Sequence, residues 1–434
     1  MILFITIFLL IIGLILYRPG KFSESSIAIL GLFVLLFLGV IQWSEVYFSV
    51  IGNEMLQPFK IVLILITLAV LSTALDDYGF FKYASYKAIL WSKNNGKVLF
   101  RNFYILTLVL TAFTSNDVDV LTVTPIILWF ALTTKINPFP YLMAVFVAAN
   151  VSSMEFLFGN LTNIVIGDVF NIGFLQFFIT MFIPTVITRV LLYFILKAIF
   201  YKELKETLLA KKDLGEVQNT LKQPLPNKRK NIIVLSTLAV VLILSVLTDF
   251  MPVELWMVTS LGALFVLLSG EFNIIERLKV IPWNVVAFVL VFIALTTKLQ
   301  TIGFIDLVTV KFSSHLQNFW EAIFFSSIAS AVSSGIINNI PTSMSLSQAF
   351  YILTQNQSNL IQQAVAFGLV IGTNLGALIT PVGALATILW MTLIRQKGYV
   401  FPLKRFMVVG IGIGFIAIMV SATLVGLQMI LLTT

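Results

Sequence analysis

The chain has 434 residues, of which 59% are hydrophobic and 11% are charged, and its mean hydropathy is +1.02. Soluble domains use about 45–50% apolar residues, so this composition excludes a soluble globule. The formal net charge is +8, but Lys and Arg fall in short stretches between apolar runs, which is typical of membrane-protein loops and predicts no nucleic-acid partner. The chain has no cysteine and a single histidine, His315, so we expect no metal site, disulfide or cofactor.

Apolar segments of membrane-spanning character follow one another from the first residue to the last. A membrane helix needs about 20 mostly apolar residues, and continuous runs, rather than ten-residue alternation, favour helices over a barrel. The first run lacks a basic start and a small-residue cleavage site, so we interpret it as a retained helix rather than a signal peptide. The segments cover residues 1–17, 25–42, 59–75, 102–133, 140–170, 175–197, 231–249, 255–270, 283–297, 318–354, 362–393 and 406–432. The sequence therefore predicts an all-α polytopic membrane protein.

A charged stretch with two prolines, residues 201–230, divides these segments into two groups. We expect a first membrane repeat over residues 1–200, a cytoplasmic linker over 201–230 and a second membrane repeat over 231–434.

Polar residues interrupt two of the segments, 102–133 and 318–354. If each is a re-entrant hairpin that leaves the membrane on the side it entered, all Lys and Arg residues lie on one side except Lys60, Arg189, Lys298 and Lys311. Interpreting either segment as a single crossing spoils this asymmetry. The positive-inside rule thus predicts two hairpins, a multi-pass protein of the cell (inner or plasma) membrane, an N-terminus outside and a cytoplasmic linker.

The two halves share residues at nearly constant offsets. Asn150 and Asn374 are 224 residues apart (374 − 150), as are Gly159 and Gly383, and Asn116 and Asn338 are 222 apart (338 − 116). In the predicted topology the first hairpin opens inside and the second outside, so the repeats are inverted. Transporters with inverted repeats place their site near the bilayer midplane, on interrupted helices.

Four polar stretches fall at depths where polar groups are costly: residues 114–125, 150–163, 333–343 and 372–384. They combine Gly or Pro, which break helices, with Asn, Ser and Thr. A half-helix begins with free N–H donors, which suit oxyanions or hydroxylated solutes, and ends with carbonyls, which suit cations. Such residues can also simply join helices, but four paired stretches favour a binding site. The candidate substrate-binding residues are Ser115, Asn116, Asn150, Asn160, Asn163, Asn338, Asn339, Thr342, Thr373, Asn374 and Thr380.

Acidic residues accompany the first two stretches. A carboxylate inside the membrane costs about 2.5–3.5 kcal/mol on insertion scales and usually serves ion or proton traffic. We therefore expect Asp117, Asp119 and Glu155 to couple transport to protons or ions, with Asp117 first. Asp168, nearer the predicted outer interface, is interpreted as structural, and Arg189 either pairs with a carboxylate or binds substrate.

These stretches resemble the arsenite/antimonite efflux permease family of the ion transporter superfamily, and the resemblance spans both halves. The matching motifs are Ser115-Asn116-Asp117 with Leu121-Thr122-Val123-Thr124-Pro125, Gly159-Asn160-Leu161-Thr162-Asn163-Ile164-Val165 with Asp168, Asn338-Asn339-Ile340-Pro341-Thr342, Gly372-Thr373-Asn374-Leu375-Gly376 and Thr380-Pro381-Val382-Gly383-Ala384-Leu385-Ala386-Thr387-Ile388-Leu389-Trp390. The resemblance implies secondary active efflux of arsenite, antimonite or a similar small oxyacid, driven by proton antiport or with a partner ATPase. It also favours a homodimer.

The chain departs from the family pattern at four positions. Asp119 and Glu155 add carboxylates, which suit a cation better than neutral arsenous acid, and Gly159 and Ala384 stand where Ser is usual. A sodium/proton antiporter and an anion carrier for dicarboxylates, citrate or sulfate therefore remain open, the latter weakened by the lack of Arg or Lys in the polar stretches. We predict no catalytic residues, since neither a His-Glu-x-x-His nor a nucleotide-binding Gly-x-x-x-x-Gly-Lys-Ser/Thr motif is present. The expected partners are a small inorganic solute, a coupling proton or sodium ion, and the lipid bilayer.

Overall fold

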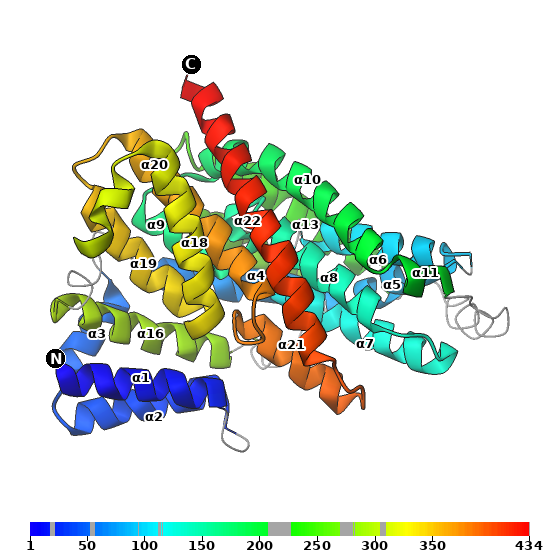
Figure 1. The fold of residues 1–434 in the computed structure, drawn as a ribbon, viewed down its shortest axis with the longest axis horizontal. Helices are drawn as coiled ribbons and strands as arrows, with labels where there is room; N and C mark the ends of the chain where they lie inside the picture. Colours follow the sequence, from blue (N-terminus) through cyan, green and yellow to red (C-terminus); the bar gives the residue numbers. More distant parts are fainter. Residues whose placement is uncertain are drawn as a thin grey trace.

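The computed structural model describes residues 1–17, 22–52, 57–93, 95–111, 114, 116–206, 227–269, 281, 283–303 and 310–433. These residues form helices joined by short connections (Figure 1). Among them, seven helices are long and apolar enough to cross a membrane. The prediction of an all-α polytopic membrane protein is confirmed.

The first half contains ten α-helices and one short 3₁₀ helix within the described residues. Their bounds are α1 (Ile2–Tyr17), α2 (Glu24–Phe37), α3 (Trp43–Ile51), α4 (Pro58–Asp77), α5 (Phe80–Leu90), α6 (Gly96–Thr111), α7 (Asn116–Thr134), α8 (Phe139–Ser152), η1 (Leu157–Gly159), α9 (Leu161–Val169) and α10 (Phe174–Ile199). The short helix α11 (Tyr201–Glu206) follows, and residues 207–226 of the predicted linker lie outside the described residues.

The second half repeats this order. Its bounds are α13 (Lys228–Leu247), α14 (Leu255–Ser269), α16 (Trp283–Thr301), η2 (Val310–Leu316), α18 (Phe319–Ile337), α19 (Asn339–Thr354), α20 (Asn359–Leu375), η3 (Gly376–Leu378), α21 (Leu385–Gln396) and α22 (Leu403–Thr433). The hairpin of α6 and α7 thus corresponds to that of α18 and α19. The broken helix of α8, η1 and α9 corresponds to that of α20, η3 and α21.

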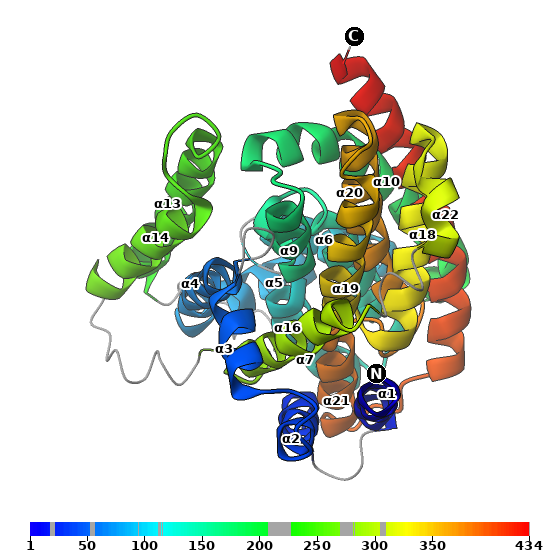
Figure 2. The ribbon, with the colours of Figure 1, turned by 90° about the vertical axis from the view of Figure 1, so that its left-hand side faces the viewer.

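Contacts between the halves come in exchanged pairs. Helix α2 packs on α16 while its counterpart α14 packs on α4, and α9 packs on α19 while α21 packs on α7. Figure 2 shows the α13–α14 pair beside α4, away from α1 and α2. Swapping the two halves exchanges the members of each pair, as a pseudo-twofold relation requires. The fold is therefore two inverted repeats, each with a re-entrant hairpin and a broken helix.

Asparagine side chains start two of the half-helices that meet at the centre. Asn338 has φ of 82°, a conformation that Asn tolerates better than most residues, and its side chain accepts a hydrogen bond from the Ile340 N–H at the start of α19. Asn160 likewise caps α9 by accepting from the Thr162 N–H. At the start of α21, Ala384 occupies the N-cap and makes no side-chain cap. The two broken helices are therefore alike in backbone and different in polar equipment.

Helix α20 lies against α18 at very short range. The side chain of Ser330 and the backbone of Ser327 and Ala331 approach Gly372 closely. Gly368 and Gly376, one turn before and after, face Ser326 and Ser334 of α18 in the same way. Small residues at this spacing let two membrane helices pack backbone to backbone.

We expect Gly372→Ala to destabilise the protein by about 1–3 kcal/mol, because the new Cβ would lie 2.8 Å from the backbone nitrogen of Ala331, which cannot move alone. Thermal unfolding in detergent measures the loss. Gly412→Ala in α22 is the matched control, since its Cβ would meet nothing within 4 Å. Equal melting temperatures for the two variants would contradict the close packing.

Candidate functional site

A cluster of neutral polar side chains joins the two broken helices at the centre of the protein. Asn374, in the last turn of α20, is fully buried. Its Oδ1 accepts hydrogen bonds from Ser153 Oγ at 2.7 Å and Asn160 Nδ2 at 2.8 Å, and its Nδ2 donates to Asn163 Oδ1 at 2.7 Å. One residue of the second half thus meets three of the first. We call Ser153, Asn160, Asn163 and Asn374 the central amide cluster.

Asn150 and Asn374 occupy equivalent places, as their 224-residue spacing predicts. Each donates its Nδ2 to the carbonyl four residues earlier, Asn150 to Phe146 and Asn374 to Val370, both at 2.8 Å. Their amide oxygens differ in partner: Asn150 Oδ1 accepts from Asn116 Nδ2 at 3.3 Å. In the first half, the hairpin tip is therefore attached to the helix break by two side chains.

Side chains also satisfy the backbone that the first break leaves free. Asn163 Nδ2 donates to the carbonyls of Ser153 at 2.8 Å and Phe156 at 3.1 Å. A Cβ at position 159 would overlap the Ser153 carbonyl oxygen, so only Gly fits there. This explains why Gly159 replaces the expected Ser: the chain turns back on itself too tightly for a side chain.

The second hairpin attaches to the second break mainly through backbone groups. The Asn339 N–H donates to Gly383 O at 3.0 Å, and Asn338 Nδ2 donates to Val382 O at 3.2 Å. Thr380 Oγ1 donates to Gly335 O at 2.6 Å. The remaining two predicted residues of this half bond nearby: Thr342 pairs with Ser333 at 3.1 Å, and Thr373 donates to Leu369 O of its own helix at 2.8 Å.

The predicted coupling residues lie around the first hairpin and the first break. Asp119 is fully buried in α7, and its Oδ1 accepts from Thr114 Oγ1 at 2.6 Å. Asp117 belongs to the first turn of α7, but its side chain, like the whole of Ser115, lies outside the described residues.

Arg189 forms an ion pair with a carboxylate, one of the two roles the sequence left open. Its Nη1 lies 2.6 Å from Glu155 Oε2, and the Tyr104 hydroxyl donates to the Arg189 carbonyl at 2.7 Å. The Glu155 side chain is 6% exposed and that of Arg189 18%. Asp168 accepts from the Gln57 N–H at 2.7 Å, in keeping with its structural interpretation.

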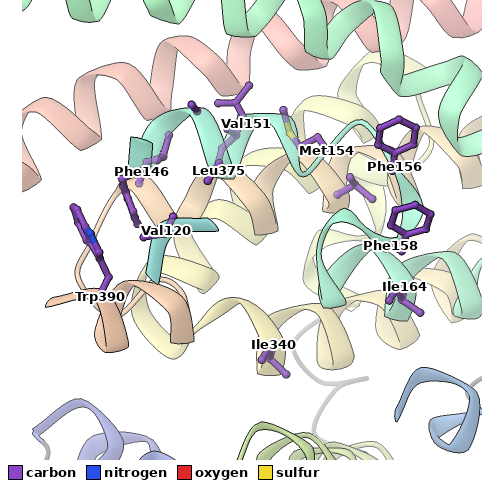
Figure 3. Close-up of a cluster of buried hydrophobic side chains, with 14 of the residues drawn as sticks. Val120, Phe146, Val151, Met154, Phe156, Phe158, Ile164, Ile340, Leu375 and Trp390 are labelled. Carbon is purple, nitrogen blue, oxygen red and sulfur yellow. The ribbon is translucent and has the colours of Figure 1, made fainter. Parts of the chain in front are cut away.

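Two contacts at the centre involve residues absent from the candidate set. Ser153 falls in the second polar stretch, so its position was a signal, but its residue type alone did not separate it from helix-joining serines. Trp390 of α21 is fully buried, donates its Nε1 to Thr124 Oγ1 of α7 at 2.7 Å and stacks on Phe146 at 4.6 Å (Figure 3). A buried Trp needs an acceptor, and Thr124 lies in the first polar stretch.

Comparison with known proteins gives consistent matches over the whole chain. The family model described as "Citrate transporter" matches residues 7–308 and 250–433. An arsenical pump membrane protein of Escherichia coli is 26% identical over 401 residues, 90% of each chain. A putative arsenical pump membrane protein of Bacillus subtilis (strain 168) is 26% identical over 405 residues, 88% of this chain and 89% of the other.

A solved structure shares the fold. The crystal structure of the Alcanivorax borkumensis YdaH transporter matches with a TM-score of 0.59 at 13% identity, covering 98% of this chain and 97% of the other. The predicted resemblance to arsenical permeases is confirmed by the curated relatives. With the family model matched from end to end, this multi-pass membrane transporter belongs to the citrate transporter (CitMHS) family.

Proposed function

We propose that this protein is a secondary active transporter that exports arsenite, antimonite or a similar small oxyacid in exchange for protons. The observation that carries the proposal is the central amide cluster, in which Asn374 of one repeat bonds to three side chains of the other. Its groups are amides and a hydroxyl, so they offer both donors and acceptors without net charge. Arsenous and antimonous acids are neutral trihydroxides, which present the same mixture.

The cluster is less suited to an anion of high charge. Recognition of carboxylates or sulfate favours Arg or Lys, and the one arginine near the first break, Arg189, is already paired with Glu155. The arsenical pump relatives support the same choice of substrate.

We assign proton coupling to the carboxylates beside the cluster. Asp119 is buried one turn beyond the first hairpin tip, Asp117 precedes it on the same helix, and Glu155 follows Ser153 at the break. A carboxylate at this depth serves ion or proton traffic by default. Proton binding there would alternate with solute binding in the amide cluster.

The proposal is tested by transport into inverted membrane vesicles. An acid-inside proton gradient should drive antimonite accumulation, and a protonophore should abolish it. No accumulation would reject the substrate. Proton release on adding sodium would instead favour a sodium/proton antiporter, and gradient-dependent citrate or sulfate uptake would favour an anion carrier.

The charge asymmetry supports a cell-membrane location with the N-terminus outside and residues 201–230 in the cytoplasm. On this topology the two hairpins open to opposite compartments. A partner ATPase would meet the cytoplasmic side, and the family resemblance also supports a homodimer.

Because the chain lacks cysteine, single cysteines can test the topology directly. We expect Gln357→Cys, after the second hairpin, to react in intact cells with a membrane-impermeant maleimide. Lys135→Cys, after the first hairpin, should react only after the cells are opened. Labelling of both residues from the same compartment would rule out the inverted hairpins.

A further inference from the structure

Two cavities lie at equivalent positions of the two repeats, away from the central amide cluster. The first, of about 380 Å³, lies between α3, α16 and α19, and we call it the α19 cavity. The second, of about 530 Å³, lies between α4, α5 and α7, and we call it the α7 cavity. Thr301 of the first follows Asp76 of the second by 225 residues, the offset of α16 from α4, and Gln348 follows Pro125 by 223, the offset of α19 from α7.

Gln348 gives the α19 cavity an unused hydrogen-bond donor. Its side chain lines the cavity and the residue is only 3% exposed, yet its Nε2 has no hydrogen-bond partner in the part of the chain that the structure describes. A buried donor without an acceptor costs about 1–3 kcal/mol. A bound ligand with an acceptor oxygen would remove this cost.

A neutralised charge pair completes the same wall. Lys298 Nζ of α16 lies 2.6 Å from Glu45 Oε1 of α3, and both residues line the cavity with Thr297. An anion would be repelled by Glu45 and a cation by Lys298. A neutral ligand with hydroxyl groups can donate to the carboxylate and accept from the ammonium and the Gln348 amide, so it fits all three.

The α7 cavity lacks this equipment. Pro125 stands where Gln348 stands in the other repeat and offers no donor. Lys82 and Lys397 outnumber the one carboxylate, Asp76. The two cavities share a position in the fold, but only the α19 cavity matches a neutral oxyacid.

We propose that the α19 cavity is a second binding site for the neutral oxyacid, occupied as the solute leaves. The identity of the solute rests on the proposed function. On the proposed topology the cavity lies at the outer face, where the exposed aromatics Trp43, Tyr47 and Phe48 of α3 fit the membrane interface. The site therefore holds the solute at the end of its path, separate from the central amide cluster.

Equilibrium binding of antimonite to the purified full-length protein tests this site. The unaltered protein should bind two antimonite molecules per chain, and Gln348→Leu should bind one. The unliganded Gln348→Leu protein should also melt at a higher temperature, because it no longer buries an unpartnered amide. Gln363→Leu in α20, whose amide bonds only to Asn359 at 3.2 Å, is the matched control and should still bind two.

The outcomes separate this inference from the proposed function. One antimonite per chain in the unaltered protein, or two in Gln348→Leu, would overturn the second site and leave the transporter proposal standing. No binding, together with no vesicle transport, would reject both. Gln348→Met, of similar length and volume, replaces the Leu variant if that protein does not fold, with the same expected loss of one site.

Discussion

Replacing Asn374 by Ala should lower gradient-driven antimonite accumulation by at least about ten-fold. The change leaves Ser153 Oγ, Asn160 Nδ2 and Asn163 Oδ1 without the amide that joins them, in a site with no exposure. Each buried group left unpartnered costs about 1–3 kcal/mol, and about 1.4 kcal/mol already corresponds to a factor of ten. Initial rates in inverted vesicles, normalised to the amount of folded protein, measure the effect.

Asn359→Ala is the matched control, because Asn359 begins the same helix at an exposed position. It should transport like the unaltered protein. Asn374→Asp keeps the size and the acceptor oxygen but loses the donor to Asn163, so we expect it to lose transport as well. Normal transport by either Asn374 variant would remove the central amide cluster from the substrate path.

The repeat and its breaks could be predicted because they depend on local chemistry. Gly or Pro beside Asn, Ser and Thr inside an apolar segment is costly unless the helix ends there, and the equal spacing of Asn150 and Asn374 places two such ends in register. The structure places both residues in the last turns of α8 and α20. The spacing did not indicate that Asn374 crosses to the other repeat while Asn150 bonds to its own hairpin.

That asymmetry arises where the repeats differ in sequence. Asn160 caps α9 and reaches Asn374, whereas Ala384, at the matching start of α21, has no polar group to reach Asn150. Pairings across helices depend on how each helix is rotated about its axis, and no periodicity in the sequence fixes this rotation. For the same reason the sequence left both roles open for Arg189 and did not identify Trp390 as the partner of Thr124.

Arg189→Met should destabilise the protein by about 3–5 kcal/mol, because it leaves the Glu155 carboxylate, 6% exposed, without its counter-ion. Glu155→Gln should cost less, since Gln can still accept a hydrogen bond from Arg189. The double variant should recover much of the stability that Arg189→Met loses, because no uncompensated charge remains. Melting temperatures of the four proteins in detergent give the coupling between the two residues.

The double variant also distinguishes a structural pair from a coupling device. If Glu155 carries the proton, the folded double variant should move antimonite down its own gradient and no longer respond to an imposed proton gradient. Retained gradient-driven accumulation would mean that the pair only fixes α10 against the first break. Proton coupling would then belong to Asp119 and Asp117 at the first hairpin, where Asp119 is fully buried beside the opening of α7.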